Sequence, residues 1–182
     1  MIEEANWAER IAHGKPSGID TQTIVSNKPV WFQKGEVTTL KPLDLNGYMV
    51  VIDTGIRGST KQAVEDVHNL CKADSGYLSF VEHIGKLVHE ARDSIEHHNF
   101  EQLATVFNLC QENLRTLTVS HEKIEQLLEV SKKQGAIAGK LTGGGRGGSM
   151  IVLASTLETA EKIVESAQSL GAHHTWIEYL GG

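Results

Sequence analysis

The chain has 182 residues, of which 40% are apolar and 22% charged, as in one compact domain or two small lobes. Its net charge of −6 provides no basic stripe, so we expect no nucleic-acid partner. No apolar run approaches the roughly 20 residues of a membrane span, and the acidic start resembles neither a signal nor a transit peptide. We therefore expect a cytoplasmic protein with no membrane segment.

The first elements carry helical and strand patterns in turn. Residues 2–13 have apolar residues at helical spacing but no capping residue before them, which suggests a fragment of a longer protein. Residues 14–20, "GKPSGID", break this helix, and residues 21–26 predict a short one. Residues 29–40 predict two strands around a turn at Lys34-Gly35, and residues 47–55 predict a buried strand.

The middle of the chain predicts four helices, over residues 60–72, 78–97, 100–117 and 121–134. We expect Ser120 to cap the last of these helices and Gly135 to end it. The last quarter predicts a strand, a glycine turn, a strand, a helix and a closing strand. Together these elements indicate an α+β fold with a four-stranded, mostly antiparallel sheet and helices packed on one face.

Residues 140–150, "KLTGGGRGGSM", place five glycines within six positions around Arg146. This run could be a linker, a plain glycine-rich hairpin, or a loop that brings backbone N–H groups against a phosphate. Its place between two apolar segments favours the phosphate loop, although it lacks the Gly-Lys-Ser/Thr of a Walker loop. Thr142 and Ser149 add hydroxyl donors.

Residues 13–20, "HGKPSGID", form a second candidate site. Ser17 is suited to cap a helix, which places Asp20 in the first turn, where the helix dipole favours an ionised carboxylate. Such an aspartate can accept or orient a substrate hydroxyl proton for attack on phosphorus. The same pattern is equally that of an ordinary helix cap.

Other candidate residues carry weaker signals. Glu9 and His13 lie four apart on one helical face and suit either a Mg²⁺ and anion site or a surface pair. Thr60 is a helix-start residue. The pairs at 97–98 and 173–174 are expected to be solvated histidines rather than metal ligands, because adjacent side chains point in different directions. Cys71 and Cys110 are expected to be reduced thiols.

"HGKPSGID" and "GKLTGGGRGGSM", separated by a helical region, resemble the second half of the mevalonate kinase family, within the GHMP small-molecule kinases. The resemblance runs over essentially the whole chain. It implies a GHMP kinase C-terminal lobe over residues 46–182, and a remnant of the N-terminal, ATP-binding lobe over residues 1–45. The family more often has Ala at 144, Gly at 146 and Cys at 149.

The resemblance also implies a role for each candidate residue. Asp20 is the implied catalytic aspartate facing the C5 hydroxyl of mevalonate, and Glu9 a Mg²⁺ ligand. His13, Ser17 and Thr60 are implied to line the mevalonate pocket. The implied cofactors are ATP and Mg²⁺, with the phosphates held near three glycines, Gly143, Gly144 and Gly145.

The chain lacks the family's N-terminal lysine motif and its Pro-x-x-x-Gly-Leu-Gly-Ser-Ser phosphate loop. We therefore expect it to be inactive alone, although the parent enzyme phosphorylates mevalonate to 5-phosphomevalonate. The alternatives are another GHMP kinase, such as a phosphomevalonate kinase, and a non-catalytic half-kinase that docks on a partner. A homodimer is an open possibility, and exposed apolar surface is expected around Trp31 and Phe32.

Overall fold

The computed structural model describes residues 23, 26, 28–33 and 36–181. Glu9, His13, Ser17 and Asp20 lie outside these residues, as do the predicted helix over 2–13, most of that over 21–26 and the turn at 34–35. The chain divides into two compact units between Asp44 and Leu45.

In the first unit, strands β1 (Val30–Gln33) and β2 (Glu36–Thr39) pair antiparallel, which confirms the predicted pair of strands. Trp31 and Phe32 on β1 are half-buried rather than exposed as expected. One reason is the ladder itself, which sets Trp31 opposite Thr38 and Phe32 opposite Val37.

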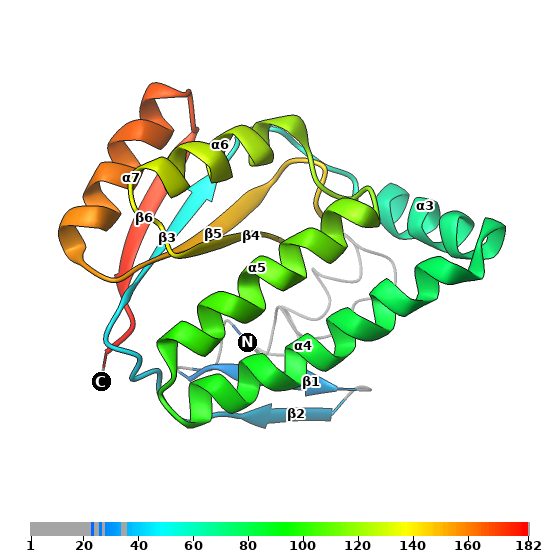
Figure 1. The fold of residues 1–182 in the computed structure, drawn as a ribbon, viewed down its shortest axis with the longest axis horizontal. Helices are drawn as coiled ribbons and strands as arrows, with labels where there is room; N and C mark the ends of the chain where they lie inside the picture. The colour runs from blue at the N-terminus through cyan, green and yellow to red at the C-terminus, as the bar shows by residue number, and fades with distance from the viewer. Residues whose placement is uncertain (1–22, 24–25, 27, 34–35, 182) are drawn as a thin grey trace. The chain divides into compact units, whose positions relative to one another are not determined.

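The second unit is built on a sheet of four strands in the order β4-β5-β3-β6 (Figure 1). These are β3 (Tyr48–Asp53), β4 (Ala138–Thr142), β5 (Ser149–Ala154) and β6 (His174–Tyr179). Every neighbouring pair is antiparallel, which confirms the predicted α+β fold and its sheet. The strands form because their β-branched and aliphatic residues suit a half-buried pleated surface.

Five α-helices and one 3₁₀ turn lie in the described part of this unit. They are α3 (Thr60–Ala73), η1 (Ser75–Tyr77), α4 (Leu78–Glu96), α5 (Phe100–Thr116), α6 (Glu122–Lys133) and α7 (Leu157–Ser169). The four helices predicted with bounds match α3 to α6 to within about two residues, the usual uncertainty of helix ends, and α7 confirms the helix predicted in the last quarter. None of them combines the length and apolar character that crossing a membrane requires.

The predicted cap of α6 is wrong, because His121 rather than Ser120 precedes the helix. The His121 side chain accepts the backbone N–H of Lys123 at 3.1 Å. Ser120 instead donates its hydroxyl proton to the Glu125 carboxylate, so it does not serve as the N-cap. The predicted end is confirmed: Gly135 follows the C-cap residue with a φ of 97°, a conformation that favours glycine.

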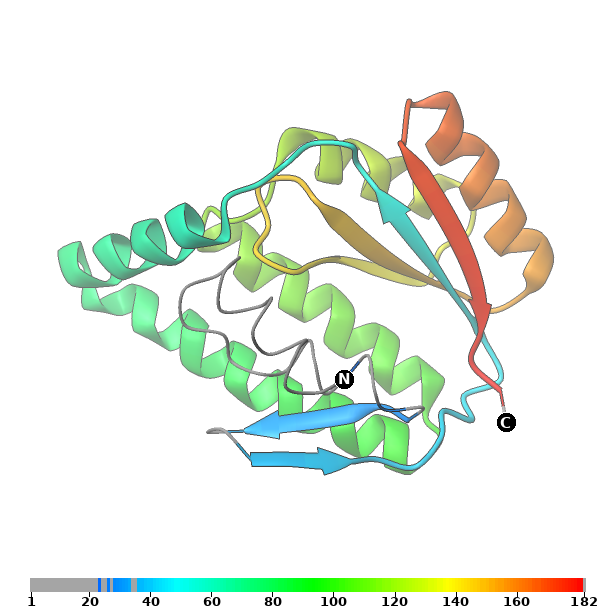
Figure 2. The ribbon, with the colours of Figure 1, turned by 180° about the vertical axis from the view of Figure 1, so that it is seen from behind.

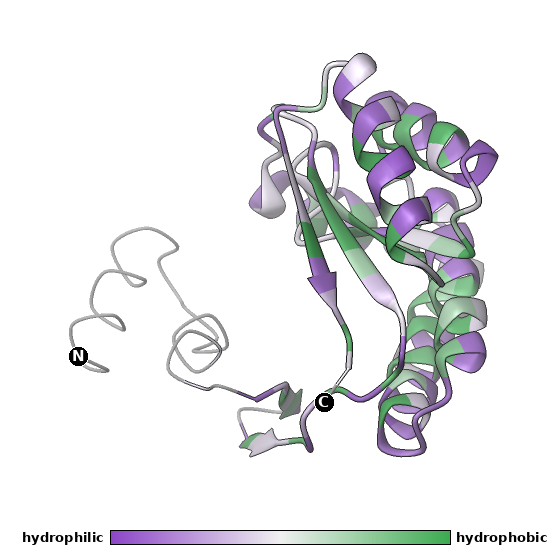
Figure 3. Ribbon diagram, turned by 90° about the vertical axis from the view of Figure 1, so that its left-hand side faces the viewer, coloured by the Kyte–Doolittle hydropathy of each residue, from purple (hydrophilic) through white to green (hydrophobic). Residues whose placement is uncertain are grey.

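One face of the sheet is covered by α6 and α7, which bury the main apolar core against the strands (Figures 2 and 3). Val50 and Ile52 of β3 are fully buried there, beside Ile124, Leu127 and Ile163 of the two helices. Helices α4 and α5 pack on each other through a second cluster, and side chains of α5 bond to the backbone of β4 and of Ile137 just before it. These bonds hold β4, the strand that leads into the glycine run.

Candidate active site

The glycine loop, residues 143–148, joins β4 to β5 as a tight connection between paired strands. Thr142 lies opposite Ser149 in the ladder, so the loop is part of the sheet and not a linker. Gly143 and Gly145 have φ values of 76° and 74°, in the left-handed region that disfavours a Cβ. At these two positions the backbone path itself therefore favours glycine.

Two neighbouring segments hold the loop by backbone hydrogen bonds. The N–H of Gly148 donates to the carbonyl of Ile56 at 2.6 Å, and the N–H of Thr54 donates to the carbonyl of Gly148 at 2.9 Å. From the other side, the N–H of Arg146 donates to the carbonyl of Val119 at 2.8 Å. A Cβ on Gly145 would overlap that same Val119 oxygen. The loop is thus a closely packed structure with a fixed position.

The start of α3 lies directly against the loop. A Cβ on Gly144 would overlap the side chain of Thr60, the first residue of α3, so these two predicted site residues are brought together. The first turn of α3 carries no acidic side chain, and Ser59 caps it by accepting the N–H of Gln62. The positive end of the helix dipole is therefore available to an anion beside the loop.

Gly143 is exposed, and a Cβ there would meet no atom within 4 Å. It is the first residue of the loop, directly after β4. The three predicted phosphate-site glycines thus differ: Gly144 and Gly145 pack against protein, and Gly143 faces open space. A ligand phosphate at Gly143 would therefore meet backbone without obstruction by a side chain.

Arg146 has a partner that the sequence did not reveal. Its guanidinium forms an ion pair with the carboxylate of Asp66 on α3, and its φ is 57°. The pKa of Asp66 lies below its usual value, because Gln62 donates a hydrogen bond to the carboxylate and Arg146 does so as well. The arginine therefore ties the loop to α3. No sequence signal links two residues that lie 80 positions apart.

A buried polar residue, Gln111 on α5, is the second functional candidate that sequence reasoning missed. Its side chain bonds to the backbone of β4 and to Ser120 and Glu125. A glutamine within an apolar helical stripe is the one available signal, because a buried amide requires partners. The pattern does not say which partners those are.

The prediction of solvated histidines is confirmed, because both pairs are exposed, and His97 and His173 also make polar contacts. His173 is largely exposed, but its Nδ1 lies 3.2 Å from the carboxylate of Asp53. The pKa of Asp53 is lowered, first by the N–H of Gly55 and also by His173. The Nδ1 of His97 lies 2.8 Å from the carbonyl of Asp93. Across the described residues no group of three His, Cys, Asp or Glu side chains could hold a metal. Cys71 and Cys110 are free thiols, as predicted.

Comparison with known proteins places these features in a family. Residues 91–173 match the model of the GHMP kinase C-terminal domain. The chain is 33% identical to mevalonate kinase of Aeropyrum pernix over 172 residues, which cover 92% of this chain and 53% of the relative. It is 28% identical to mevalonate kinase of Arabidopsis thaliana, covering 91% of this chain and 46% of the relative.

Solved structures extend the match to every residue. The crystal structure of mevalonate kinase from methicillin-resistant Staphylococcus aureus superimposes on this chain with a TM-score of 0.78 and 60% sequence identity. The match covers 100% of this chain and 58% of the other. Leishmania major mevalonate kinase with bound R-mevalonate is 26% identical with a TM-score of 0.84, over 100% and 60%. The chain spans about half the length of the curated relatives it matches. Residues 91–173 therefore form a GHMP kinase C-terminal domain, and the chain is related, over its whole length, to the C-terminal half of mevalonate kinases.

Proposed function

We propose that this chain supplies one half of an enzyme that transfers the terminal phosphoryl group of ATP to mevalonate, forming 5-phosphomevalonate. The observation that carries the proposal is the 60% identity to the Staphylococcus aureus mevalonate kinase over every residue of the chain. The "HGKPSGID" motif and the glycine loop both fall within that match. Such a reaction proceeds by positioning and charge neutralisation rather than by covalent catalysis.

The substrate side of the proposed site comes from residues 9–20. Asp20 is proposed to accept or orient the proton of the C5 hydroxyl, so that the oxygen can attack phosphorus in line. His13 and Ser17 are proposed to bind mevalonate, and Glu9 to hold Mg²⁺. These roles rest on the motif and on the relatives, because residues 1–22 are outside the described part of the structure.

The phosphate side of the proposed site comes from the glycine loop and α3. The loop fits an anion, because Gly143 is open and Gly144 sits against Thr60 at the positive end of a helix. Bound Mg-ATP would supply the phosphoryl group and a cation that neutralises its charge. Gly143, Gly144 and Gly145 are proposed to place backbone against the phosphates, and Thr60 to face mevalonate. The free thiols Cys71 and Cys110 are compatible with a cytoplasmic setting.

The proposal is tested by supplying the part of the relatives that lies outside the match. The chain would be fused behind the upstream residues of the Staphylococcus aureus enzyme that precede the matched region, and ADP formation followed with Mg-ATP and mevalonate. We expect turnover by the fusion, and none by the chain alone, because an ordered ATP phosphate loop supplies most of the electrostatic stabilisation. In the fusion, Asp20→Ala should lower kcat by at least about 100-fold.

The same fusion distinguishes the substrates. Activity with mevalonate but not with phosphomevalonate supports the assignment, and the reverse preference contradicts it. If the unfused chain turns over mevalonate and Asp20→Ala abolishes that activity, the catalytic role of Asp20 is supported. The expectation that the chain is inactive alone would then be wrong.

A further inference from the structure

Gln111 is a polar residue placed inside the structure. It lies on α5, its side chain is 1% exposed, and every buried side-chain polar atom in the described region has a hydrogen-bond partner. A buried primary amide needs both acceptors and donors around it, so its orientation is fixed by what surrounds it. The hydrogen-bond partners of Gln111 lie on β4, which leads into the glycine loop, and in the segment around Ser120, which follows the Val119 contact of the loop.

The oxygen of the Gln111 amide holds the strand that leads into the loop. Oε1 accepts the backbone N–H of Leu141 at 2.9 Å, and this bond is buried. Leu141 lies on β4, the edge strand, and is two residues before Gly143. The side chain of Gln111 therefore takes the place of a neighbouring strand for this N–H group.

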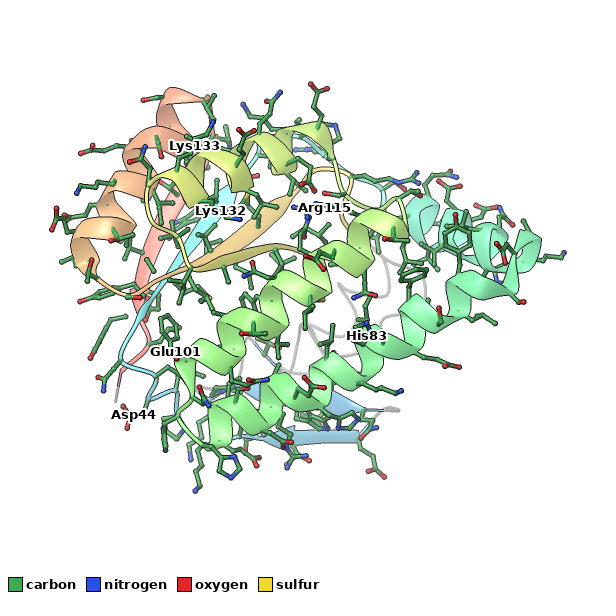
Figure 4. The ribbon with its side chains drawn as sticks, in the orientation of Figure 1. Asp44, His83, Glu101, Arg115, Lys132 and Lys133 are labelled. Atoms are coloured by element: carbon green, nitrogen blue, oxygen red, sulfur yellow. The ribbon has the colours of Figure 1, made fainter. Side chains whose placement is uncertain are left out.

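The nitrogen of the same amide holds the segment that supports the middle of the loop. Nε2 donates to the Ser120 hydroxyl at 3.1 Å and to Oε1 of Glu125 at 2.9 Å. The Ser120 hydroxyl also donates to Glu125. Arg115, labelled on α5 in Figure 4, donates from Nε to Oε2 of Glu125 at 2.7 Å. Ser120 directly follows Val119, whose carbonyl binds the N–H of Arg146.

We propose that Gln111 is a positioning residue that sets the glycine loop by fixing Leu141 and the Val119-Ser120 support with one amide. The assignment of the loop to phosphate binding rests on the proposed function, whereas the positioning of the loop does not. The amide cannot be reversed, because its NH₂ group would then face the N–H of Leu141 and its oxygen the Glu125 carboxylate. Because one amide bonds to both Leu141 and Ser120, a displacement of either residue moves the amide and weakens its hydrogen bond to the other residue.

Amide hydrogen exchange on the 182-residue chain, resolved by NMR, tests the proposal with two variants. Gln111→Met removes both arms of the amide at similar volume, and Ser120→Ala removes only the arm that reaches the Val119 support. In both variants we expect the N–H of Arg146 to exchange about tenfold faster. The N–H of Gly148, which bonds to Ile56, serves as the reference within each molecule.

Asn108→Leu is the matched control. Asn108 also lies on α5 and donates from its side-chain amide to the β4 side, at the carbonyl of Ile137 and 3.1 Å away. That bond is at the other end of β4 and has no connection to the loop, so Arg146 exchange should stay at the wild-type rate. If Ser120→Ala and Gln111→Met leave Arg146 exchange as in this control, the proposal is wrong.

In the active fusion, the two variants should lower kcat about tenfold and leave the KM for mevalonate unchanged, because the loop contributes to the transferring phosphate. If Gln111→Met and Ser120→Ala lower kcat no more than Asn108→Leu does, the proposed effect of Gln111 on catalysis is wrong. If the fusion shows no activity with any substrate, the proposed function fails, and the exchange rates still decide whether Gln111 positions the loop.

Discussion

Two glycines of the loop have nearly the same backbone conformation and different surroundings. Gly143 and Gly145 have φ values of 76° and 74°, so an alanine at either position meets the same left-handed strain. Only at Gly145 would the new Cβ also overlap a neighbouring atom, the carbonyl oxygen of Val119, whereas at Gly143 it would meet open space. The two positions therefore separate backbone strain from steric overlap.

We predict that Gly145→Ala lowers the free energy of unfolding by about 1–3 kcal/mol more than Gly143→Ala, the usual cost of overpacking. The Val119 oxygen is backbone and already accepts the N–H of Arg146, so it cannot rotate away. Urea denaturation of both variants measures the difference. Equal destabilisation of the two variants would show that the Val119 support yields and that the loop is less rigid than its hydrogen bonds imply.

Lys140, on β4 beside the loop, is a half-buried cation. Its ammonium donates to the carbonyl of Leu141 at 2.6 Å and lies 5.7 Å from the centre of the Phe107 ring. Burial lowers the pKa of Lys140 below 10.5, with a smaller opposing influence from Cys110. The folded state therefore binds this proton less tightly than the unfolded state does.

We predict from this shift that the stability of the wild type relative to Lys140→Met rises with pH. Between the lowered pKa of Lys140 in the folded state and its pKa near 10.4 in the unfolded state, the unfolded state binds more protons. A rise in pH therefore favours the folded state, because it removes the cost of burying the charged ammonium. Urea unfolding from pH 7 to 10.5 measures it. Lys162 is the control: Glu158 raises its pKa, so its stabilising effect is lost only above the unfolded pKa, and the stability of the wild type relative to Lys162→Met should stay flat up to about pH 10. A flat difference for Lys140 would contradict the burial of its charge.

At the scale of the elements, the sequence predicts where helices and strands lie, because periodicity and chain punctuation are local. The stripe of apolar residues in α4 and the glycine after α6 are visible without any tertiary information. The cap of α6 was mispredicted for a non-local reason. Ser120 is the better capping residue by type, but its hydroxyl bonds to Glu125, five residues on, and His121 takes its place.

The candidate site was only partly predictable. The glycine loop and Thr60 carry local signals, and the structure brings Thr60 against Gly144. The pairing of Arg146 with Asp66 depends on the packing of α3 beside the loop, which no spacing rule contains. Gln111 was missed for the same reason, since its partners come from β4 and from the segment before α6. The chemistry of residues within one motif can be predicted from the sequence. Contacts between motifs that are distant in the sequence become known only from the structure.

At the scale of the whole molecule, residues 45–181 have what an independent domain needs. The unit carries its own core, centred on fully buried residues such as Ile52, Leu127 and Met150. Its two ends are joined to each other, because Leu45 donates its N–H to the carbonyl of Leu180, and Leu180 donates to Gly47 at 2.8 Å. Chain ends that meet in this way are typical of units that fold alone.

We predict that residues 45–181, expressed alone, unfold in one cooperative transition, with a free energy of unfolding within about 1 kcal/mol of that of the same unit in the full chain. Every strand of the four-stranded sheet and both helices that cover its face lie within these residues, so no part of this core is lost. Urea denaturation followed by far-UV circular dichroism compares the two proteins. Loss of the cooperative transition would show that residues 1–44 complete the domain, and the division between the lobes would then have to lie further upstream.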